Sequence, residues 1–414
     1  MNGQDVREAR PAPFVWDHDA FNTDYNRSGL TGYTGLDAHT VAQLSIMPAH
    51  RAQLGGRGMY KAGFAVRQDG VLIASPVNSE SPVQPVPYPA PGHPLSNSWP
   101  VTLFTSADGG RSWQAMEHTP LFGKDGSLTC LDDGALLFTT ESMDGVGYSD
   151  DGGATWELIG FGIGRETEYE WVCPVRSPIL HPDGTISFMR CVGTIEGASP
   201  EGHVAPRCRG WLVHSTDNGK TWTDRRKVEV WDDSFPMFIE GDFARMPDGR
   251  ILGASRFEWP HPIAGKELPY PPGTMPNDHA CAHMVIMEST DEGVTWTKPR
   301  EFLQYSECQS QFTLLEDDRL LATYTHYHLP FGVAAVISYD YGKTWDFDHP
   351  LQLALSNCIR TGWATTRQLS DGALVTVHAL EPYHLEPEEN GRNVCQSVRW
   401  ELPPRTDLPS RRFG

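Results

Sequence analysis

The sequence has few cysteines and few basic residues for its length. Its 414 residues include 8 cysteines, scattered without a Cys-x-x-Cys pair. This usage indicates neither a zinc site nor a disulfide framework, so we expect no metal and no cofactor. Lys and Arg number 33 against 53 Asp and Glu, which gives a net charge of −20. Such a surface repels phosphate backbones and anionic lipid, so we expect no nucleic-acid partner and no membrane partner.

The sequence also lacks long apolar segments. No run approaches the roughly 18 residues of a membrane-spanning helix. The first residues, MNGQDVREARPAPF, have no apolar region typical of a secretory signal, so we expect a cytoplasmic location. In contrast, 40 Gly, 33 Pro and 13 Trp are abundant. This composition is typical of many short strands joined by turns.

One phrase, S-x-D-x-G-x-[ST]-W, occurs five times and is called the Asp box below. The copies occupy residues 106–113, 149–156, 215–222, 289–296 and 338–345. Its Ser and Asp side chains can accept hydrogen bonds from backbone N–H groups, and its Gly can take a positive φ. The final Trp can pack between layers. The Asp box therefore predicts a rigid hairpin that joins two strands.

A second repeat alternates with the Asp boxes. Six short turns, most containing Asp-Gly, occur at residues 68–71, 132–135, 182–185, 247–250, 316–319 and 370–373. Each unit therefore reads as strand, turn, strand, variable loop, strand, Asp box, strand. Six four-stranded antiparallel units, none able to bury both faces alone, predict an all-β six-bladed β-propeller with five Asp-box hairpins.

The sixth unit lacks an Asp box and ends in residues 393–403. Residues 40–50 read as a strand that could pair with this end, which would close the ring and remove an exposed sheet edge. The predicted propeller therefore spans residues 40–403, with an N-terminal arm at 1–39 and a C-terminal tail at 404–414. The sequence predicts no oligomeric state.

Strand direction predicts which rim of the propeller carries function. Both short turns of an up-and-down blade must lie on one rim, so the longer connections, 77–101, 191–209, 257–282 and 379–392, share the other. Loops on a rigid scaffold commonly carry binding and catalysis. Residues at the beginnings of the innermost strands and at the ends of the second strands should therefore meet in a central pocket.

These positions hold acids, bases, amides and aromatic residues. The acids are Glu80, Glu240, Asp242 and Glu307; the bases are Lys61, Arg176, Arg256 and Arg360; the others are Gln309, His326, His328 and Trp363, with Thr129 in the second blade. Bidentate hydrogen bonds and aromatic faces suit polar rings such as sugars. The mixture therefore predicts a carbohydrate ligand.

The Asp boxes, the turns and the stretch IEGDFARMPDGRILGASR (239–256) together resemble the sialidase (neuraminidase) superfamily of BNR or Asp-box repeat proteins. That family forms six-bladed propellers, and the resemblance covers roughly residues 58–402. It implies that Glu240 corresponds to the glutamate that polarises the nucleophile, and Arg256 to an arginine that binds the sugar carboxylate. ECQS (307–310) resembles the family's CQ element on the fifth inner strand.

The resemblance is incomplete at the chemical groups. Lys61 stands in place of the family's first arginine, and Trp363 in place of its tyrosine nucleophile. Residues 328–333 hold no third arginine, and Glu80 is the one carboxylate in residues 78–100, where the family has an acid Asp. Indole cannot replace a phenol as nucleophile, so we do not expect hydrolysis of sialic acid by the family mechanism.

The sequence therefore predicts a glycosidase, in which Lys61, Arg176, Arg256 and Arg360 could together bind the carboxylate of an acidic sugar. Glu240 and Asp242 would act as acid, base or nucleophile, and either Glu307 or Glu80 would complete a pair of carboxylates. Structural roles are open too: Glu240 could form a buried ion pair with Arg256, and Trp363 could pack between blades instead of covering a sugar.

Two other functions stay open from the sequence. His326 and His328 share one strand face, a spacing that suits substrate contact, proton transfer or metal ligation. Together with Tyr327 they would supply the base of a lyase that acts on uronate sugars. Alternatively, the chain would be a propeller that binds glycans without catalysis.

Overall fold

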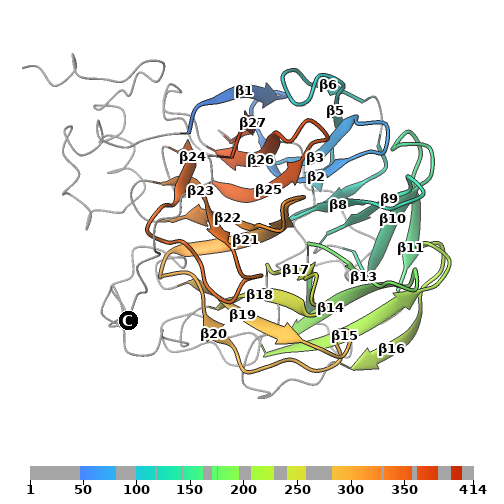
Figure 1. The fold of residues 1–414 in the computed structure, drawn as a ribbon. Helices are drawn as coiled ribbons and strands as arrows, with labels where there is room; N and C mark the ends of the chain where they lie inside the picture. Colours follow the sequence, from blue (N-terminus) through green and yellow to red (C-terminus); the bar gives the residue numbers. More distant parts are fainter. Residues whose placement is uncertain are drawn as a thin grey trace, which may run out of the picture.

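In a computed structural model, the chain forms six antiparallel sheets that are arranged radially around one axis (Figure 1). The structure describes residues 47–80, 99–116, 119–140, 143–161, 170–174, 176–194, 207–227, 240–257, 282–327, 331–356, 361–380 and 393–402. This is the predicted six-bladed β-propeller. Within these ranges there is no helix that is long and apolar enough to cross a membrane.

The first three blades follow one another along the chain. The first contains β2 (Met59–Val66), β3 (Leu72–Asn78), β5 (Phe104–Ser106) and β6 (Gln114–Ala115). The second contains β8 (Ser127–Cys130), β9 (Leu136–Thr139), β10 (Gly145–Ser149) and β11 (Glu157–Gly160). The third contains β12 (Glu170–Pro174), β13 (Ile179–Leu180), β14 (Ile186–Thr194), β15 (Arg207–Ser215) and β16 (Thr223–Lys227). A short pair outside these sheets joins β4 (Trp99–Pro100), which precedes β5 in sequence, to β7 (Phe122–Gly123), which precedes β8.

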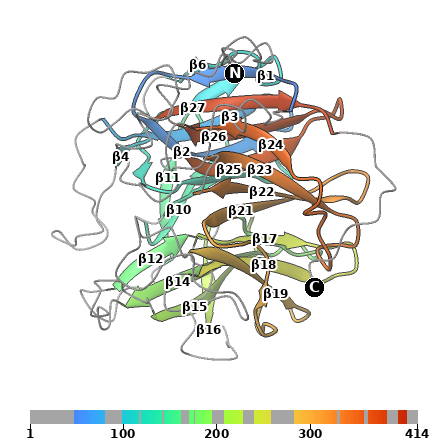
Figure 2. The ribbon, with the colours of Figure 1, turned by 90° about the vertical axis from the view of Figure 1, so that its left-hand side faces the viewer.

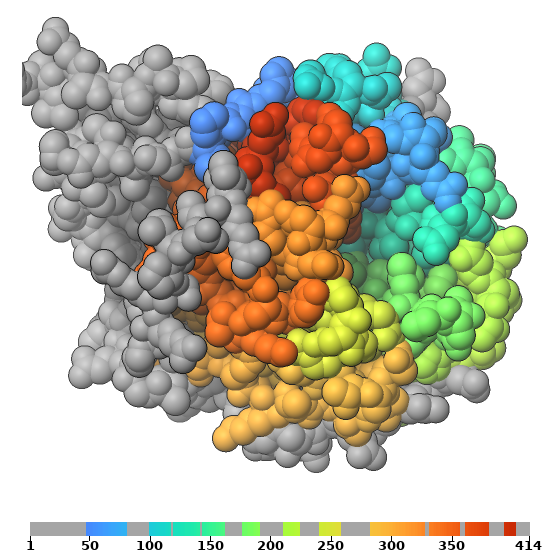
Figure 3. All heavy atoms as spheres, viewed as in Figure 1, coloured from blue at the N-terminus to red at the C-terminus, as the bar shows by residue number. Residues whose placement is uncertain are grey.

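The remaining blades repeat this order. The fourth contains β17 (Asp242–Arg245), β18 (Ile251–Phe257), β19 (His283–Ser289) and β20 (Arg300–Glu301). The fifth contains β21 (Glu307–Leu314), β22 (Leu320–His326), β23 (Gly332–Ser338) and β24 (Leu351–Leu355). The sixth contains β25 (Gly362–Gln368), β26 (Leu374–Leu380), β27 (Val394–Trp400) and β1 (Ala49–Leu54). The blades follow one another around the axis in chain order, from blue to red (Figure 3).

The ring closes where β1 pairs with β27. The two strands are antiparallel, with Ala49 opposite Trp400 and Leu54 opposite Cys395 (Figure 2). The closing strand therefore spans 49–54 and overlaps the predicted segment 40–50 only at its end. Residues 40–46, the predicted arm 1–39 and the predicted tail 404–414 lie outside the described residues.

The Asp boxes are hairpins held by their own side chains. In the second box, Ser149 donates from Oγ to Asp151 at 2.8 Å, and the Asp151 carboxylate accepts from the backbone N–H of Thr155 at 2.9 Å. The indole of Trp156 donates to the Gly153 carbonyl at 2.9 Å. Because these bonds are local, the hairpin forms wherever the phrase occurs, as predicted.

The first Asp box also contributes to ring closure. Its indole, Trp113 Nε1, donates to Ser397 Oγ of β27 at 2.8 Å, and Ser397 Oγ in turn donates to the Gly110 carbonyl at 2.9 Å. The box of the first blade is thus hydrogen-bonded to the last blade, where β27 also pairs with β1.

The short turns lie on the same rim as the Asp boxes. Arg67, at the turn of the first blade, donates to the carbonyl of Gly152 in the second Asp box at 3.2 Å. Arg250, at the turn of the fourth blade, donates to the carbonyl of Tyr341 in the last Asp box at 3.4 Å. Since neighbouring blades are joined here by their turns, the beginnings of the inner strands lie on the opposite rim.

The core lies between the blades rather than at the axis. One apolar cluster joins the fourth and fifth blades and includes Leu252, Phe312 and Trp345. Another joins the first and sixth blades through Phe64 and Val377. Because both faces of each blade are buried in this way, the polar groups of the molecule gather on the rims and along the axis.

Candidate functional site

Five side chains come to the axis from equivalent positions in five blades. Each lies eight residues before the Asp at the second position of its blade's turn: Lys61, Asp125, Glu240, Gln309 and Trp363. All five have a positive φ, between 44° and 59°. This conformation is uncommon for residues other than glycine, and it recurs here as a feature of the propeller. The equivalent residue of the third blade, Val175, lies outside the described residues.

In three blades a β-bulge produces this conformation. Strands β2, β21 and β25 each carry one extra residue relative to the paired strand at this point, as between Tyr60 and Gly63 in β2. A bulge bends the strand and changes the direction of a side chain. The axial residues therefore point toward the neighbouring blades instead of alternating across their own sheet.

Glu240 lies at the centre of this group, which together with Arg256 and Arg176 is called the axial cluster below. Arg256 Nη1 donates to Glu240 Oε2 at 2.5 Å, and Gln309 Nε2 donates to the same oxygen at 3.3 Å. Lys61 Nζ lies 3.7 Å from Glu240 Oε1. The carboxylate is thus fixed by donors from the first, fourth and fifth blades, and its side chain is 12 % exposed.

Lys61 also forms a buried ion pair with Asp125 of the second blade, and the two side chains are 7 % and 2 % exposed. The ammonium lies 5.4 Å from the ring centroid of Tyr60 and 5.1 Å from that of Trp363. Asp125 was not among the predicted site residues. The eight-residue spacing to the turn would have identified it.

Trp363 is fully buried, at 0 % exposed, and packs between blades. Its Nε1 donates to the Gly126 carbonyl at 2.8 Å, and its backbone N–H donates to Gln309 Oε1 at 3.1 Å. The guanidinium of Arg176 lies 4.0 Å from its ring centroid. Of the two roles that the sequence left open for Trp363, these contacts favour packing over covering a sugar, because protein already covers the ring.

Arg176 brings the third blade into the axial cluster. Its side chain is 2 % exposed and donates from Nη1 to the Ala364 carbonyl at 2.7 Å. Burial lowers the pKa of Arg176 to about 10, while the charges of Asp242 and Glu240 oppose this effect. Arg176 is therefore placed to balance carboxylates at the axis.

Asp242 lies deeper than Glu240, although strand alternation predicted both on one face. It is 0 % exposed, and its Oδ2 accepts a hydrogen bond from the backbone N–H of Phe312 at 2.7 Å. Burial raises the pKa of Asp242, while hydrogen bonds from Ser177 and Phe312 and the charge of Arg176 oppose the increase. The contact ties the fourth blade to the fifth, so the geometry favours a structural role over the predicted catalytic one.

Glu307 and His326 face each other across β21 and β22. Glu307 Oε1 lies 3.9 Å from His326 Nδ1, and Glu307 Oε2 accepts from the backbone N–H of Gln304 at 3.0 Å. The His326 ring stacks on Tyr324 with 5.0 Å between centroids. Burial, followed by the charge of Glu307, raises the pKa of Tyr324 well above its ordinary range.

Among the described contacts, none joins the remaining predicted residues to the axial cluster. Glu80 is exposed just after β3, and its backbone N–H donates to Asn78 Oδ1 at 3.1 Å. His328 and Arg360 lie outside the described residues. In the part of the chain that the structure describes, no group of three or more His, Cys, Asp or Glu side chains is arranged to hold a metal ion.

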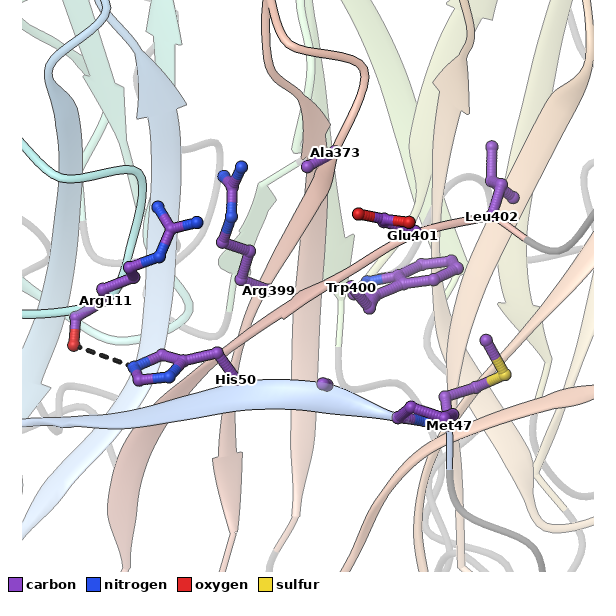
Figure 4. A pocket seen from close by; sticks show the side chains of 10 residues that line it. Met47, His50, Arg111, Ala373, Arg399, Trp400, Glu401 and Leu402 are labelled. Atoms are coloured by element: carbon purple, nitrogen blue, oxygen red, sulfur yellow. Dashed lines mark hydrogen bonds between the residues drawn. The ribbon is translucent and has the colours of Figure 1, made fainter.

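A groove of about 490 Å³ lies on the rim of the turns, remote from the axial cluster in the fold (Figure 4). It is bounded by β1, the end of β27, the first Asp box and the turn of the sixth blade, and His50 Nε2 lies 3.1 Å from the Arg111 carbonyl there. None of the predicted site residues lines this groove.

Two protein-family models match this sequence, and both describe Asp-box (BNR) repeats. The model of the BNR repeat-like domain matches residues 178–406, more than half of the 414-residue chain, and the BNR/Asp-box repeat model matches residues 148–158. The chain belongs to the BNR repeat-like domain family. The resemblance to sialidase-like Asp-box proteins that the sequence predicted is thereby confirmed.

The relatives of this BNR-family chain are distant. A sialidase of Clostridium perfringens is 26 % identical over 145 residues, which are 34 % of this chain and 35 % of that protein. The match therefore spans about a third of the curated relative.

Three solved structures show the same fold. A protein of unknown function from Dyadobacter fermentans has a TM-score of 0.55 and 18 % identity, covering 85 % of this chain and 100 % of that one. An α-L-arabinanase of Penicillium chrysogenum, complexed with arabinobiose, has a TM-score of 0.50 and 16 % identity, covering 85 % and 96 %. A Trypanosoma rangeli sialidase mutant displaying trans-sialidase activity has a TM-score of 0.52 and 13 % identity, covering 86 % and 60 %.

Proposed function

We propose that this chain is a glycoside hydrolase that binds a sugar at the axis of the propeller, with Glu240 as a catalytic carboxylate. The observation that carries the proposal is the fixation of Glu240 by Arg256 and Gln309, at 2.5 and 3.3 Å, with Lys61 at 3.7 Å. Similarity to a sialidase and to an arabinanase complexed with arabinobiose supports the reaction class.

The proposed role of Glu240 follows from the chemistry of glycoside hydrolysis. Positive charge develops at the anomeric carbon in an oxocarbenium-like transition state, and a fixed carboxylate beside it stabilises that charge or attacks the carbon. Because Arg256 and Gln309 both donate to Oε2, the other oxygen of Glu240 is the one oriented toward Lys61. Such fixation holds the carboxylate without reorganisation during the reaction.

Glycosidases commonly need a second carboxyl group as proton donor. Of the two candidates that the sequence offered, Glu307 is the better supported by position. It is 7 % exposed and lies two residues before Gln309, which contacts Glu240. Glu80 is exposed beyond the end of β3. We therefore propose Glu307 as the acid that protonates the leaving oxygen.

The proposal does not use a tyrosine nucleophile at the sixth blade. Trp363 occupies that position, is fully buried, and donates its indole N–H to the Gly126 carbonyl at 2.8 Å. Indole carries no oxygen that could form a glycosyl intermediate. The structure thus offers support for a carboxylate-based mechanism and none for the mechanism that the sialidase resemblance implies.

A lyase is the less favoured alternative. Its base would be Tyr327 or a neighbouring histidine. Burial, followed by the charge of Glu240, raises the pKa of Tyr327 well above its ordinary range, so the phenol stays protonated at neutral pH. A protonated phenol cannot remove the proton next to a uronate carboxylate, although it can donate a hydrogen bond to a sugar hydroxyl.

The experiment that tests the reaction class is a screen of purified protein on neutral and acidic glycans, with reducing sugar and ultraviolet absorbance recorded together. We expect reducing sugar without ultraviolet absorbance. Unsaturated products that absorb in the ultraviolet would establish a lyase. Binding of a glycan without any product would establish a noncatalytic propeller and contradict the proposal.

A further inference from the structure

We infer that the sugar bound at the axial cluster is neutral, with no carboxylate held by the cations of this cluster. The inference rests on the proposed function and names its substrate class. It departs from the expectation that Lys61, Arg176, Arg256 and Arg360 would together bind an acidic sugar. Three of these four cations are described, and two of them, Lys61 and Arg256, are already paired with carboxylates of the protein.

Lys61 is engaged by two carboxylates of the chain itself. It forms an ion pair with Asp125, with side chains only 7 % and 2 % exposed, and it lies 3.7 Å from Glu240 Oε1. Lys61 is the residue that replaces the family's first arginine, and Asp125 occupies the equivalent axial position in the next blade. The carboxylate that Lys61 binds is therefore internal.

Arg256 is paired with Glu240, and Arg176 is covered by Trp363 and bonded to a backbone carbonyl. Arg256 Nη1 lies 2.5 Å from Glu240 Oε2, and the Arg256 side chain is 5 % exposed. Arg176 lies 4.0 Å from the ring centroid of Trp363 and donates to the Ala364 carbonyl at 2.7 Å. The positive charge of Arg176 lowers the pKa of Asp242, which lies deeper along the axis.

Positive and negative charges of the described axial residues are therefore balanced. The cations Lys61, Arg176, Arg256 and Arg367 are accompanied by the carboxylates Asp125, Glu240, Asp242 and Glu307. A substrate carboxylate at this place would meet no excess of positive charge.

Binding an acidic sugar would also disrupt buried ion pairs. To reach Lys61, a substrate carboxylate would have to displace Asp125 or Glu240, and the displaced group would remain buried without its cation. The negative charges of both groups would repel the incoming carboxylate. The cluster thus discriminates against acidic sugars by like charges that are fixed in the fold.

A neutral sugar avoids both difficulties. Its hydroxyl groups can donate to the oxygens of Glu240 and accept from the amide of Gln309 or the ammonium of Lys61, because paired charged groups still hydrogen-bond to neutral ligands. The geometry therefore points to a neutral pentose or hexose residue, without a carboxylate on its ring.

The test compares sugars that differ only in the carboxylate. Galactose and galacturonic acid would be titrated into the full-length protein by calorimetry, and 4-nitrophenyl glycosides in matched neutral and acidic pairs would be assayed for turnover. We expect a preference of at least about tenfold for the neutral member in affinity and in kcat/KM. A stronger response to the acidic member, or equal responses including no response to either, would overturn the inference.

A charge variant tests the reason for the preference. Asp125→Asn frees Lys61 from its internal carboxylate, so we expect the affinity for galacturonic acid relative to galactose to rise at least about tenfold. Asp69→Asn, which removes one charge at the turn of the first blade on the other rim, is the matched control and should leave the ratio unchanged. An Asp125→Asn protein that folds, by its fluorescence spectrum, with an unaltered ratio would contradict the assignment.

The outcomes separate this inference from the proposed function. Preferred cleavage of an acidic glycoside would support the proposed glycosidase activity but reject the inference that the sugar is neutral. Absence of all turnover would reject the proposed glycosidase activity. The ratio of the affinities for galactose and galacturonic acid, measured by calorimetry, would still decide whether the site prefers a neutral sugar.

Discussion

Lys61 Nζ and Glu240 Oε1 lie 3.7 Å apart, although Lys61 belongs to the first blade and Glu240 precedes the first strand of the fourth. The two residues occupy equivalent places in their blades, eight residues before the turn, and both have a positive φ. Equivalent positions of the repeated blades thus meet at the axis. Because they share a backbone conformation but carry different side chains, the cluster that they form is asymmetric.

The first prediction concerns the buried cation at the axis. Lys61→Met leaves Asp125 without its ion-pair partner, and removing one member of a buried pair costs about 3–5 kcal/mol. We expect the free energy of unfolding in urea to fall by about this amount, and a large part to return in the double variant Lys61→Met, Asp125→Asn. Lys343→Met, at an exposed Asp-box position, is the control. Equal stability of the Lys61 and Lys343 variants would show that the pair does not form.

A second prediction concerns the close approach of the first two blades. A Cβ atom on Gly63 would lie 2.7 Å from Ser75 Oγ and 2.8 Å from the backbone nitrogen of Leu128 in the neighbouring blade. Backbone cannot move aside easily, so Gly63→Ala should reduce the free energy of unfolding by about 1–3 kcal/mol. At Gly56 a Cβ would meet nothing within 4 Å, which makes Gly56→Ala the matched control. Similar stabilities of the two variants would contradict the packing described here.

A third prediction follows from the acidity of the Asp boxes. Burial alone would raise the pKa of Asp108 and Asp151, but hydrogen bonds from Ser112 and Thr155, among others, lower both from the usual 3.8 to about 2. A pKa that is lower in the folded state gives stability that is present above the unfolded pKa and lost as pH falls through the folded one. We therefore expect the free energy of unfolding to decrease between about pH 4 and pH 2.

The double variant Asp108→Asn, Asp151→Asn tests this cause. Since asparagine does not titrate, the decrease between about pH 4 and pH 2 should become smaller than in the unaltered protein. Thermal unfolding followed by circular dichroism at several pH values measures it. An unchanged dependence on pH would exclude these two carboxylates as its source.

A fourth prediction separates packing from sugar contact at Trp363. Trp363→Phe loses the hydrogen bond to the Gly126 carbonyl and part of a buried ring, so stability should fall by about 1–3 kcal/mol. Trp156→Phe loses the same kind of bond, to Gly153, in an Asp box remote from the axis. If Trp363 only packs, neither variant changes KM for a cleaved glycoside; an increase in KM confined to Trp363→Phe would restore the stacking role.

The fold could be predicted from the sequence because its signals are local. The hydrogen bonds of an Asp box, such as those of Ser149 and Asp151, involve residues of the same phrase, and the short turns likewise bond within themselves. Counting both repeats therefore gave the number of blades and the rim on which the turns lie. The bounds of the closing strand β1 could not be counted in this way, because its pairing partner lies at the other end of the chain.

The candidate site could be predicted only in part. Glu240, Arg256, Lys61 and Gln309 do meet, but Thr129 was taken as the axial position of the second blade, where the structure has Asp125. The error arose because strand beginnings were located from apolar patterns, which do not show the bulges and positive φ values that the crowded axis produces. The sequence also could not show how deeply each carboxylate is buried. Strand alternation predicted Glu240 and Asp242 on one face, but it gave no sign that Asp242 is 0 % exposed.

The measurement that tests the account most directly is turnover of the cleaved glycoside by Glu240→Gln. The amide keeps the size of the side chain and can still contact Gln309, but it carries no charge to stabilise the transition state. We predict that kcat falls by about 100-fold or more while the far-ultraviolet spectrum is retained. Glu316→Gln, at an exposed turn on the other rim, should retain full activity. Full activity of a correctly folded Glu240→Gln protein would contradict the central claim that this carboxylate carries the chemistry.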